Sequence, residues 1–126
     1  MTTPVSSGPY NALACKKVTL TYASSSLELG VLGAGAKPVF WQVDFKTAFN
    51  AGTTNSVSVT STNTNSESAT PVASSSLDES TTNDYTQLGG KKLVYDTTYT
   101  VNYAQTGTAA TAGEVDVYVF YYPHSN

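Results

Sequence analysis

The sequence predicts an all-β protein: a single antiparallel β-sandwich or jelly-roll-like domain with an extended N-terminal arm. Apolar and polar residues alternate with period two in several short segments, which is typical of strands with one buried face. Ser, Thr and Tyr are abundant, and no segment has the apolar period of a useful amphipathic helix. The length of 126 residues fits one domain. We divide it into an arm at 1–14 and a sandwich at 15–126.

An extended arm is expected at 1–14 because prolines and a glycine interrupt any periodic pattern there. Its sizeable apolar side chains are Val5, Tyr10 and Leu13. Such a segment is either a frayed terminus or an arm that docks on a neighbouring protein. In the second case these three side chains belong to an interface.

Three strands are expected in the first half of the chain, at 17–23, 39–46 and 56–60. The core face of the first comprises Val18, Leu20 and Tyr22. The core face of the second comprises Val39, Trp41, Val43 and Phe45. Phe40 falls on the opposite face, and Trp41 is expected in the core rather than in a sugar-stacking platform. Between the first two strands, glycines and a proline in 24–38 predict a turn.

A long loop is expected at about 61–83, where the chain is almost entirely Ser, Thr, Asn, Ala and acids. One helical turn is expected inside it, at 74–79. A loop of this length without periodic structure is either disordered or functional.

Strands are expected in the last third of the chain at 85–88, 91–95, 98–103 and 114–122. Tyr99, Val101 and Tyr103 are expected to point inward. Glycines in 104–113 predict a hairpin loop. The last strand is therefore expected to pair back on 98–103.

The last strand carries the most informative pattern in the sequence. Its core face comprises Val115, Val117, Val119 and Tyr121. Its other face starts with two acids and ends with three aromatic residues, Tyr118, Phe120 and Tyr122. Burying such a ring contributes about 1.5–3 kcal/mol. We therefore expect these rings, together with Phe40, to be covered by another subunit or by a partner surface.

Charge and composition exclude several classes of protein. Charged residues make up 12% of the chain, against roughly 25% in an average domain. All six basic residues are lysines, and nine acids give a net charge of -3. A nucleic-acid binder normally has a basic patch and uses Arg, so no nucleic-acid partner is expected. No apolar run is long enough to cross a bilayer, so no membrane partner is expected either. Without a leader pattern or a second cysteine, the chain is expected to be made in a cytoplasm.

The sequence offers little catalytic or metal chemistry. Its sole histidine, His124, stands near the C-terminus with no second group to hold it, and zinc needs several Cys or His ligands. Cys15 is expected to be a small buried residue. The acids Asp78, Glu79 and Asp84 lack the spacing of a calcium loop. Possible paired carboxylates for glycoside hydrolysis are Asp44, Asp96, Glu114 and Asp116, but nothing in the sequence indicates that any two of them converge. We expect no enzyme activity, no cofactor and no metal.

Several segments, taken in order, resemble the small β-rich structural proteins of tailed bacteriophages, especially the head decoration (cement) proteins. These segments are Lys-Val-Thr-Leu-Thr-Tyr at 17–22, Leu-Gly-Ala-Gly-Ala at 32–36, the strand 39–45 with the run 47–55, and the stretch 99–119. The resemblance covers about 16–122 except 61–83, and its motifs are strand and turn patterns rather than catalytic signatures.

The resemblance implies a homotrimer that binds the major capsid protein and stabilises the mature head, on the outer surface of the virion. It also implies that the chain is made in the host cytoplasm. Two alternatives stay open at this point. One is a phage tail or fibre-tip module that binds a host surface glycan, and the other is a carbohydrate-binding module.

Overall fold

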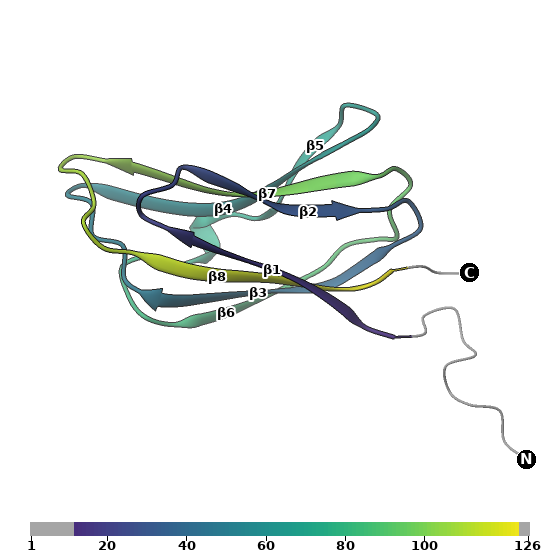
Figure 1. Ribbon diagram of the computed structural model, residues 1–126, viewed down its shortest axis with the longest axis horizontal. Helices are drawn as coiled ribbons and strands as arrows, with labels where there is room; N and C mark the ends of the chain where they lie inside the picture. Colours follow the sequence, from purple (N-terminus) through teal and green to yellow (C-terminus); the bar gives the residue numbers. More distant parts are fainter. Residues whose placement is uncertain (1–11, 124–126) are drawn as a thin grey trace, which may run out of the picture.

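Residues 12–123, described here in a computed structural model, form two four-stranded antiparallel sheets packed face to face (Figure 1). Sheet A has the strand order β1-β8-β3-β6, and sheet B has the order β2-β7-β4-β5. The strands are β1 (Ala14–Thr21), β2 (Ser26–Leu32), β3 (Lys37–Thr47), β4 (Thr54–Asn63), β5 (Ser68–Val72), β6 (Asp84–Leu88), β7 (Thr97–Thr106) and β8 (Glu114–Tyr122). The predicted all-β sandwich is confirmed.

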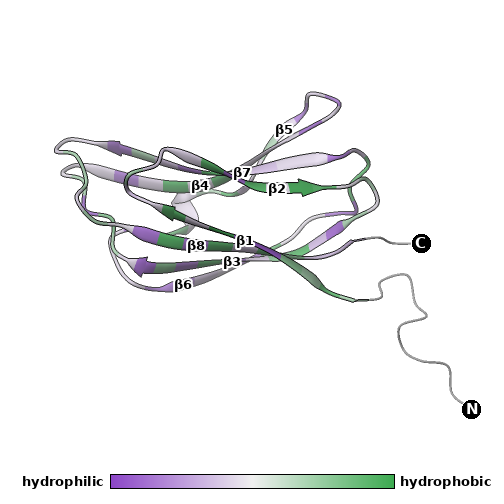
Figure 2. Cartoon of the chain, in the orientation of Figure 1, coloured by the Kyte–Doolittle hydropathy of each residue, from purple (hydrophilic) through white to green (hydrophobic). Residues whose placement is uncertain are grey.

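The core lies between the two sheets and is built from the inward faces of the strands. Its largest fully buried side chains include Trp41, Phe45 and Phe49. β7 contributes Tyr99, Val101 and Tyr103, and β8 contributes Val115, Val117 and Val119, as their alternation predicted. Figure 2 shows apolar residues concentrated along the strands in the middle of the sandwich.

The predicted pairing of the last strand with 98–103 is wrong. β8 pairs with β1 and β3 in sheet A, whereas β7 pairs with β2 and β4 in sheet B. The segment 107–113 is therefore an arch that carries the chain from one sheet to the other rather than a hairpin loop. Turn residues look alike in both cases, since glycines at positive φ (Gly107 and Gly113) serve either connection.

Two bulges shift the side-chain pattern in ways the alternation did not predict. The segment 26–32, taken above as the approach to a turn, is strand β2, and a bulge between Glu28 and Gly30 leaves Val31 exposed and Leu32 buried. A second bulge between Pro38 and Phe40 makes Pro38, rather than Val39, the buried residue at the start of β3. Tyr22 lies beyond the end of β1 and is 38% exposed, so its predicted inward position is also wrong.

About half of the predicted loop at 61–83 is regular secondary structure. β4 continues to Asn63, β5 follows at Ser68–Val72, and a 3-10 turn at Ser74–Ser76 stands inside the predicted helical turn. In the turn between the strands, the side-chain carbonyl of Asn63 accepts hydrogen bonds from the backbone of Asn65 and Glu67. Small polar residues are enough to form β5, because this edge strand pairs with one strand only and buries only Val72 deeply.

The segment 91–95, predicted as a strand, is irregular and connects β6 to β7. Cys15, expected to be buried, is exposed on the outer face of β1. Between residues 12 and 123 no helix has the length and hydrophobicity needed to span a membrane.

Candidate interaction surface

The outer face of sheet A, which points away from the core, carries the aromatic residues singled out in the sequence. Strand register places Phe120 directly opposite Phe40. The same row continues to Cys15 on β1 and Leu88 on β6, so it is apolar across all four strands. We call this row with its neighbours the aromatic face: Leu13, Cys15, Phe40, Leu88, Tyr118, Phe120 and Tyr122.

The rings of the aromatic face pack on one another in the plane of the sheet. The Phe40 and Phe120 rings are stacked, with centroids 4.6 Å apart, and the Tyr118 ring lies 6.2 Å from that of Phe120. The ammonium of Lys17 stands 5.5 Å from the centroid of the Tyr118 ring. These cross-strand contacts cover the rings only in part, because Phe40, Tyr118 and Phe120 remain half-buried. Leu88 is 79% exposed, so the row ends in open apolar surface.

An acidic row lies on the same face, at Asp116, two residues before Tyr118 on β8. It runs from Thr19 on β1 through Asp116 and Asp44 to Asp84 on β6. The Thr19 hydroxyl donates a 2.6 Å hydrogen bond to Asp116, whose other oxygen lies 3.7 Å from Lys17 Nζ. Lys46 lies 2.8 Å from Asp44. The outer face of sheet A is therefore divided into an apolar half and an acidic half.

The acidic row shifts the pKa values of two carboxyl groups in opposite directions. The hydrogen bond from Lys46 lowers the pKa of Asp44, and the hydrogen bond to Asp44 raises the pKa of Asp84. Asp84 is the more weakly acidic because its neighbour already carries the negative charge.

The predicted interface residues fall into two groups. The structure brings Phe40, Tyr118, Phe120 and Tyr122 onto one face, and Leu13 beside the start of β1 is 46% exposed. Val5 and Tyr10 lie outside the described residues, as does His124. Sequence reasoning missed Cys15 and Leu88, because their place in the apolar row follows from strand order rather than from local pattern.

The carboxylates considered for catalysis or calcium binding do not form a metal cluster. Asp44 and Asp116 are neighbours across the sheet, whereas Asp96 accepts a backbone hydrogen bond from Ala34 in a separate loop. Within residues 12–123, no group of three or more His, Cys, Asp or Glu side chains is placed to hold a metal ion.

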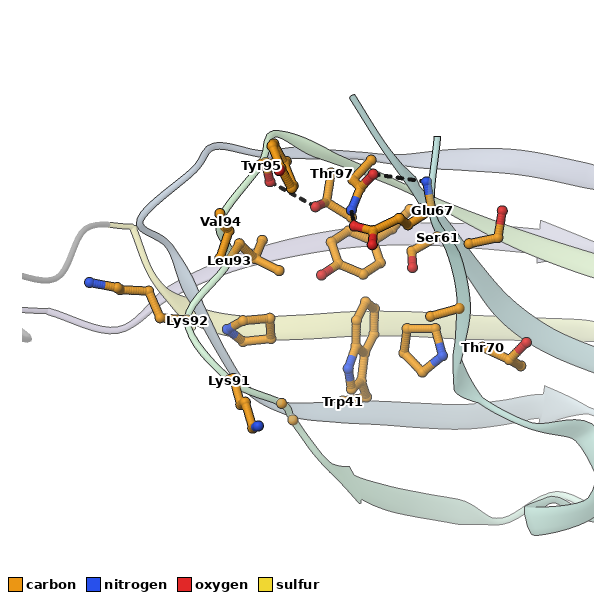
Figure 3. A pocket seen from close by; sticks show the side chains of 18 of the residues that line it. Trp41, Ser61, Glu67, Thr70, Lys91, Lys92, Leu93, Val94, Tyr95 and Thr97 are labelled. Carbon is orange, nitrogen blue, oxygen red and sulfur yellow. Dashed lines mark hydrogen bonds between the residues drawn. The ribbon is translucent and has the colours of Figure 1, made fainter. Parts of the chain in front are cut away.

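A second feature is a pocket of about 810 Å³ between sheet B's edge strand β5 and the segment that follows β6 (Figure 3). Trp41 and Tyr99 line it from the core side, and Lys91 and Lys92 stand on its rim. Sequence reasoning did not foresee this pocket, because β5 was taken as part of a loop.

No protein-family model matches the sequence, and no match is found among curated proteins. The fold is similar to a chain in the cyanophage Pam1 capsid asymmetric unit, with a TM-score of 0.64 and 16% identity, covering 97% of this chain and 91% of that one. It is also similar to a chain in the acid-stable capsid of the Helicobacter pylori bacteriophage KHP30, with a TM-score of 0.56 and 12% identity, covering 90% and 89%. At these identities the likeness shows the fold.

Proposed function

We propose that this protein is a non-enzymatic structural component of a phage virion, a decoration protein that binds the major capsid protein on the outside of the head and stabilises the shell. The aromatic face carries the proposal. Its four rings are partly exposed, Leu88 is 79% exposed, and all of them lie on the side of sheet A that the core does not use.

The likeness to the two phage capsid chains supports the proposal through chain length. Each of those chains is covered over about nine tenths of its length, so each is close in size to this one. Both therefore consist almost entirely of this one sandwich, as this chain does. A small protein that binds to a shell formed by another protein would also consist of one such domain.

The division of the outer face indicates what the partner surface looks like. In a trimer, apolar side chains of the neighbouring subunit would cover the row from Cys15 to Leu88, and its basic side chains would meet the acidic row through Asp116 and Asp44. Because the chain has few charges, docking desolvates few of them. A homotrimer would bury these faces between its subunits and offer three arms to the shell, so moderate affinity at each arm is enough for tight attachment.

One possible glycan platform, the ring face of Trp41, is not available on the surface of this fold. Trp41 is 1% exposed and packs against Tyr99, with ring centroids 4.9 Å apart. Its ring face cannot stack on a sugar, which is what a tail-tip or carbohydrate-binding module would need from it.

The substitution Phe120→Ser tests the aromatic face as an interface. We expect the trimer to dissociate into monomers or to aggregate, because a small polar side chain replaces the ring at the centre of the apolar row. Multi-angle light scattering measures the change. The control is Val31→Ser, which removes a 48% exposed apolar side chain from sheet B and should leave the trimer intact. A Phe120→Ser protein that folds and remains trimeric would show that this face is not the trimer interface.

The arm is proposed to contact the capsid shell through Val5, Tyr10 and Leu13. Because β1 begins at Ala14 and pairs with β8 there, the deletion that isolates the arm removes residues 2–11. We expect this deletion to lower the number of copies bound per particle while the oligomer stays intact, as measured by gel densitometry of purified particles. Full occupancy after the deletion would take Val5 and Tyr10 out of the interface.

A further inference from the structure

The pocket beside β5 is built from two kinds of surface. One wall is the edge strand β5 with Glu67 before it, and the opposite wall is the irregular segment 88–95. Figure 3 shows Trp41 between the two walls, with Lys91 and Lys92 on one side and Glu67 and Thr70 on the other. The volume of about 810 Å³ is in the range of sites that hold small ligands or short peptides.

Two deeply buried side chains present unpaired polar groups to this pocket. Trp41 is 1% exposed and Tyr99 is 4% exposed. Neither the indole N–H of Trp41 nor the hydroxyl of Tyr99 makes a hydrogen bond within residues 12–123. In this part of the chain, every side-chain nitrogen or oxygen that has no solvent-accessible surface makes a hydrogen bond. The two unpaired groups must therefore have some accessible surface of their own. Both groups therefore reach open space, and the pocket that they line provides it.

The indole N–H of Trp41 and the hydroxyl of Tyr99 can each donate a hydrogen bond to a ligand in the pocket. An indole N–H can only donate. Burial raises the pKa of Tyr99 to about 12, so its hydroxyl keeps its proton at neutral pH. A ligand that brings carbonyl or carboxylate oxygens would satisfy both groups, whereas water is their only other partner in an apolar setting that includes Pro38 and Pro71.

The walls favour an extended peptide over other acceptor-rich ligands. β5 is the last strand of sheet B, and within the described chain no strand pairs with its outer edge. An edge strand of this kind offers backbone groups to an added strand. Lys91 and Lys92 form no ion pair with any described residue, which leaves their charge for an acidic side chain.

We propose that this pocket binds an extended peptide segment with acidic side chains, which lies along β5, accepts hydrogen bonds from Trp41 and Tyr99, and places a carboxylate between Lys91 and Lys92. The site meets the aromatic face only at Leu88, and its peptide-binding role does not depend on the proposed virion role. A saccharide is the other class of ligand with many acceptors, and the buried ring face of Trp41 disfavours it.

The sole tryptophan of the chain provides the readout, because Trp41 lines the pocket. The probe is an acetylated and amidated hexapeptide, Thr-Val-Asp-Val-Asp-Val, and the matched peptide has Lys in place of Asp. We expect a saturable change in Trp41 emission with the acidic peptide alone. Lys91→Ala/Lys92→Ala should weaken binding by about tenfold, and Tyr99→Phe by about fivefold. Lys16→Ala/Lys46→Ala, which removes the same charge elsewhere, should bind as the parent does.

Three outcomes would overturn the proposal. One is no saturable emission change with either peptide up to millimolar concentration. Another is equal binding of the acidic and basic peptides. The third is an emission change with glucose or glucuronate that the acidic peptide does not compete away, which would make the pocket a saccharide site. Far-UV circular dichroism of each variant confirms that loss of binding is not loss of fold.

Discussion

Gly113 is a residue whose identity the fold requires. Its φ is +148°, and a Cβ built on it would lie 2.3 Å from Cδ2 of Phe49, a core ring that is 2% exposed. Gly113 ends the arch between β7 and β8, and its carbonyl accepts a hydrogen bond from the backbone of Tyr22. The close approach lets the arch seal the core at Phe49.

Gly113→Ala is therefore expected to destabilise the protein strongly. The methyl group would force Phe49 to move and would strain the backbone, with a loss of more than about 2 kcal/mol in the free energy of unfolding. Urea denaturation measures this loss. Gly90→Ala is the matched control, because a Cβ there meets no heavy atom within 4 Å. Equal stability of the two variants would contradict the packing described at Phe49.

The Asp44–Asp84 contact makes stability depend on pH in a defined direction. Because the folded state raises the pKa of Asp84, its charged form costs stability. This cost is absent below the ordinary pKa of 3.8 and appears as pH rises through the raised value. Asp84→Asn should therefore raise the melting temperature at pH 7 and leave it nearly unchanged at pH 3. A gain of the same size at both pH values would show that the two carboxyl groups do not interact.

Among the elements, the link between β5 and β6 shows how a buried carboxyl group can anchor a segment. Glu79 is 7% exposed, and its Oε2 accepts hydrogen bonds from the backbone N–H of Val57, at 2.9 Å, and from the hydroxyl of Ser74, at 2.5 Å. Its backbone carbonyl accepts a third from Phe49. One side chain thus ties the connection to strand β4.

Removing that anchor with Glu79→Ala should leave the Val57 N–H buried and unpaired. We expect a loss of about 1.5–3 kcal/mol in the free energy of unfolding, as for other hydrogen bonds to charged groups. The control is Glu28→Ala on the exposed face of β2, which should change stability by less than about 0.5 kcal/mol. Urea denaturation of both variants makes the comparison, and similar losses would show that Glu79 does not anchor the link.

Strand alternation predicted the elements whose two faces differ and failed where both faces are polar or a bulge intervenes. β3, β7 and β8 were predicted closely, because their apolar faces meet the core. β5 was missed, since an edge strand of small polar residues has almost no apolar face to reveal it. Which strands pair is a long-range property, so the local pattern around Gly113 suggested a hairpin where the chain changes sheets.

The same reasoning explains how much of the candidate sites the sequence revealed. The aromatic face was foreseen through Tyr118, Phe120 and Phe40, because each stands on the wrong face of a recognisable strand. Leu88 and Cys15 complete the apolar row only through strand order. The pocket at Trp41 depends on the position of β5, so no local sequence pattern predicted it.

For the whole molecule, the central claim is that the outer face of sheet A is covered when the protein does its work. The core is complete within the sandwich, and the rings of Phe40 and Phe120 are left outside it. The low share of charged residues, 12%, suits a surface that packs against another protein, because few charges must be desolvated.

Under the proposed virion role, an electron cryomicroscopy reconstruction of the phage particle tests that claim most directly. The account predicts copies of the sandwich on the outside of the head, at symmetry-equivalent positions, with Phe40, Tyr118 and Phe120 covered by a neighbouring subunit. A head without such copies, or one on which these rings face solvent in every copy, would contradict it.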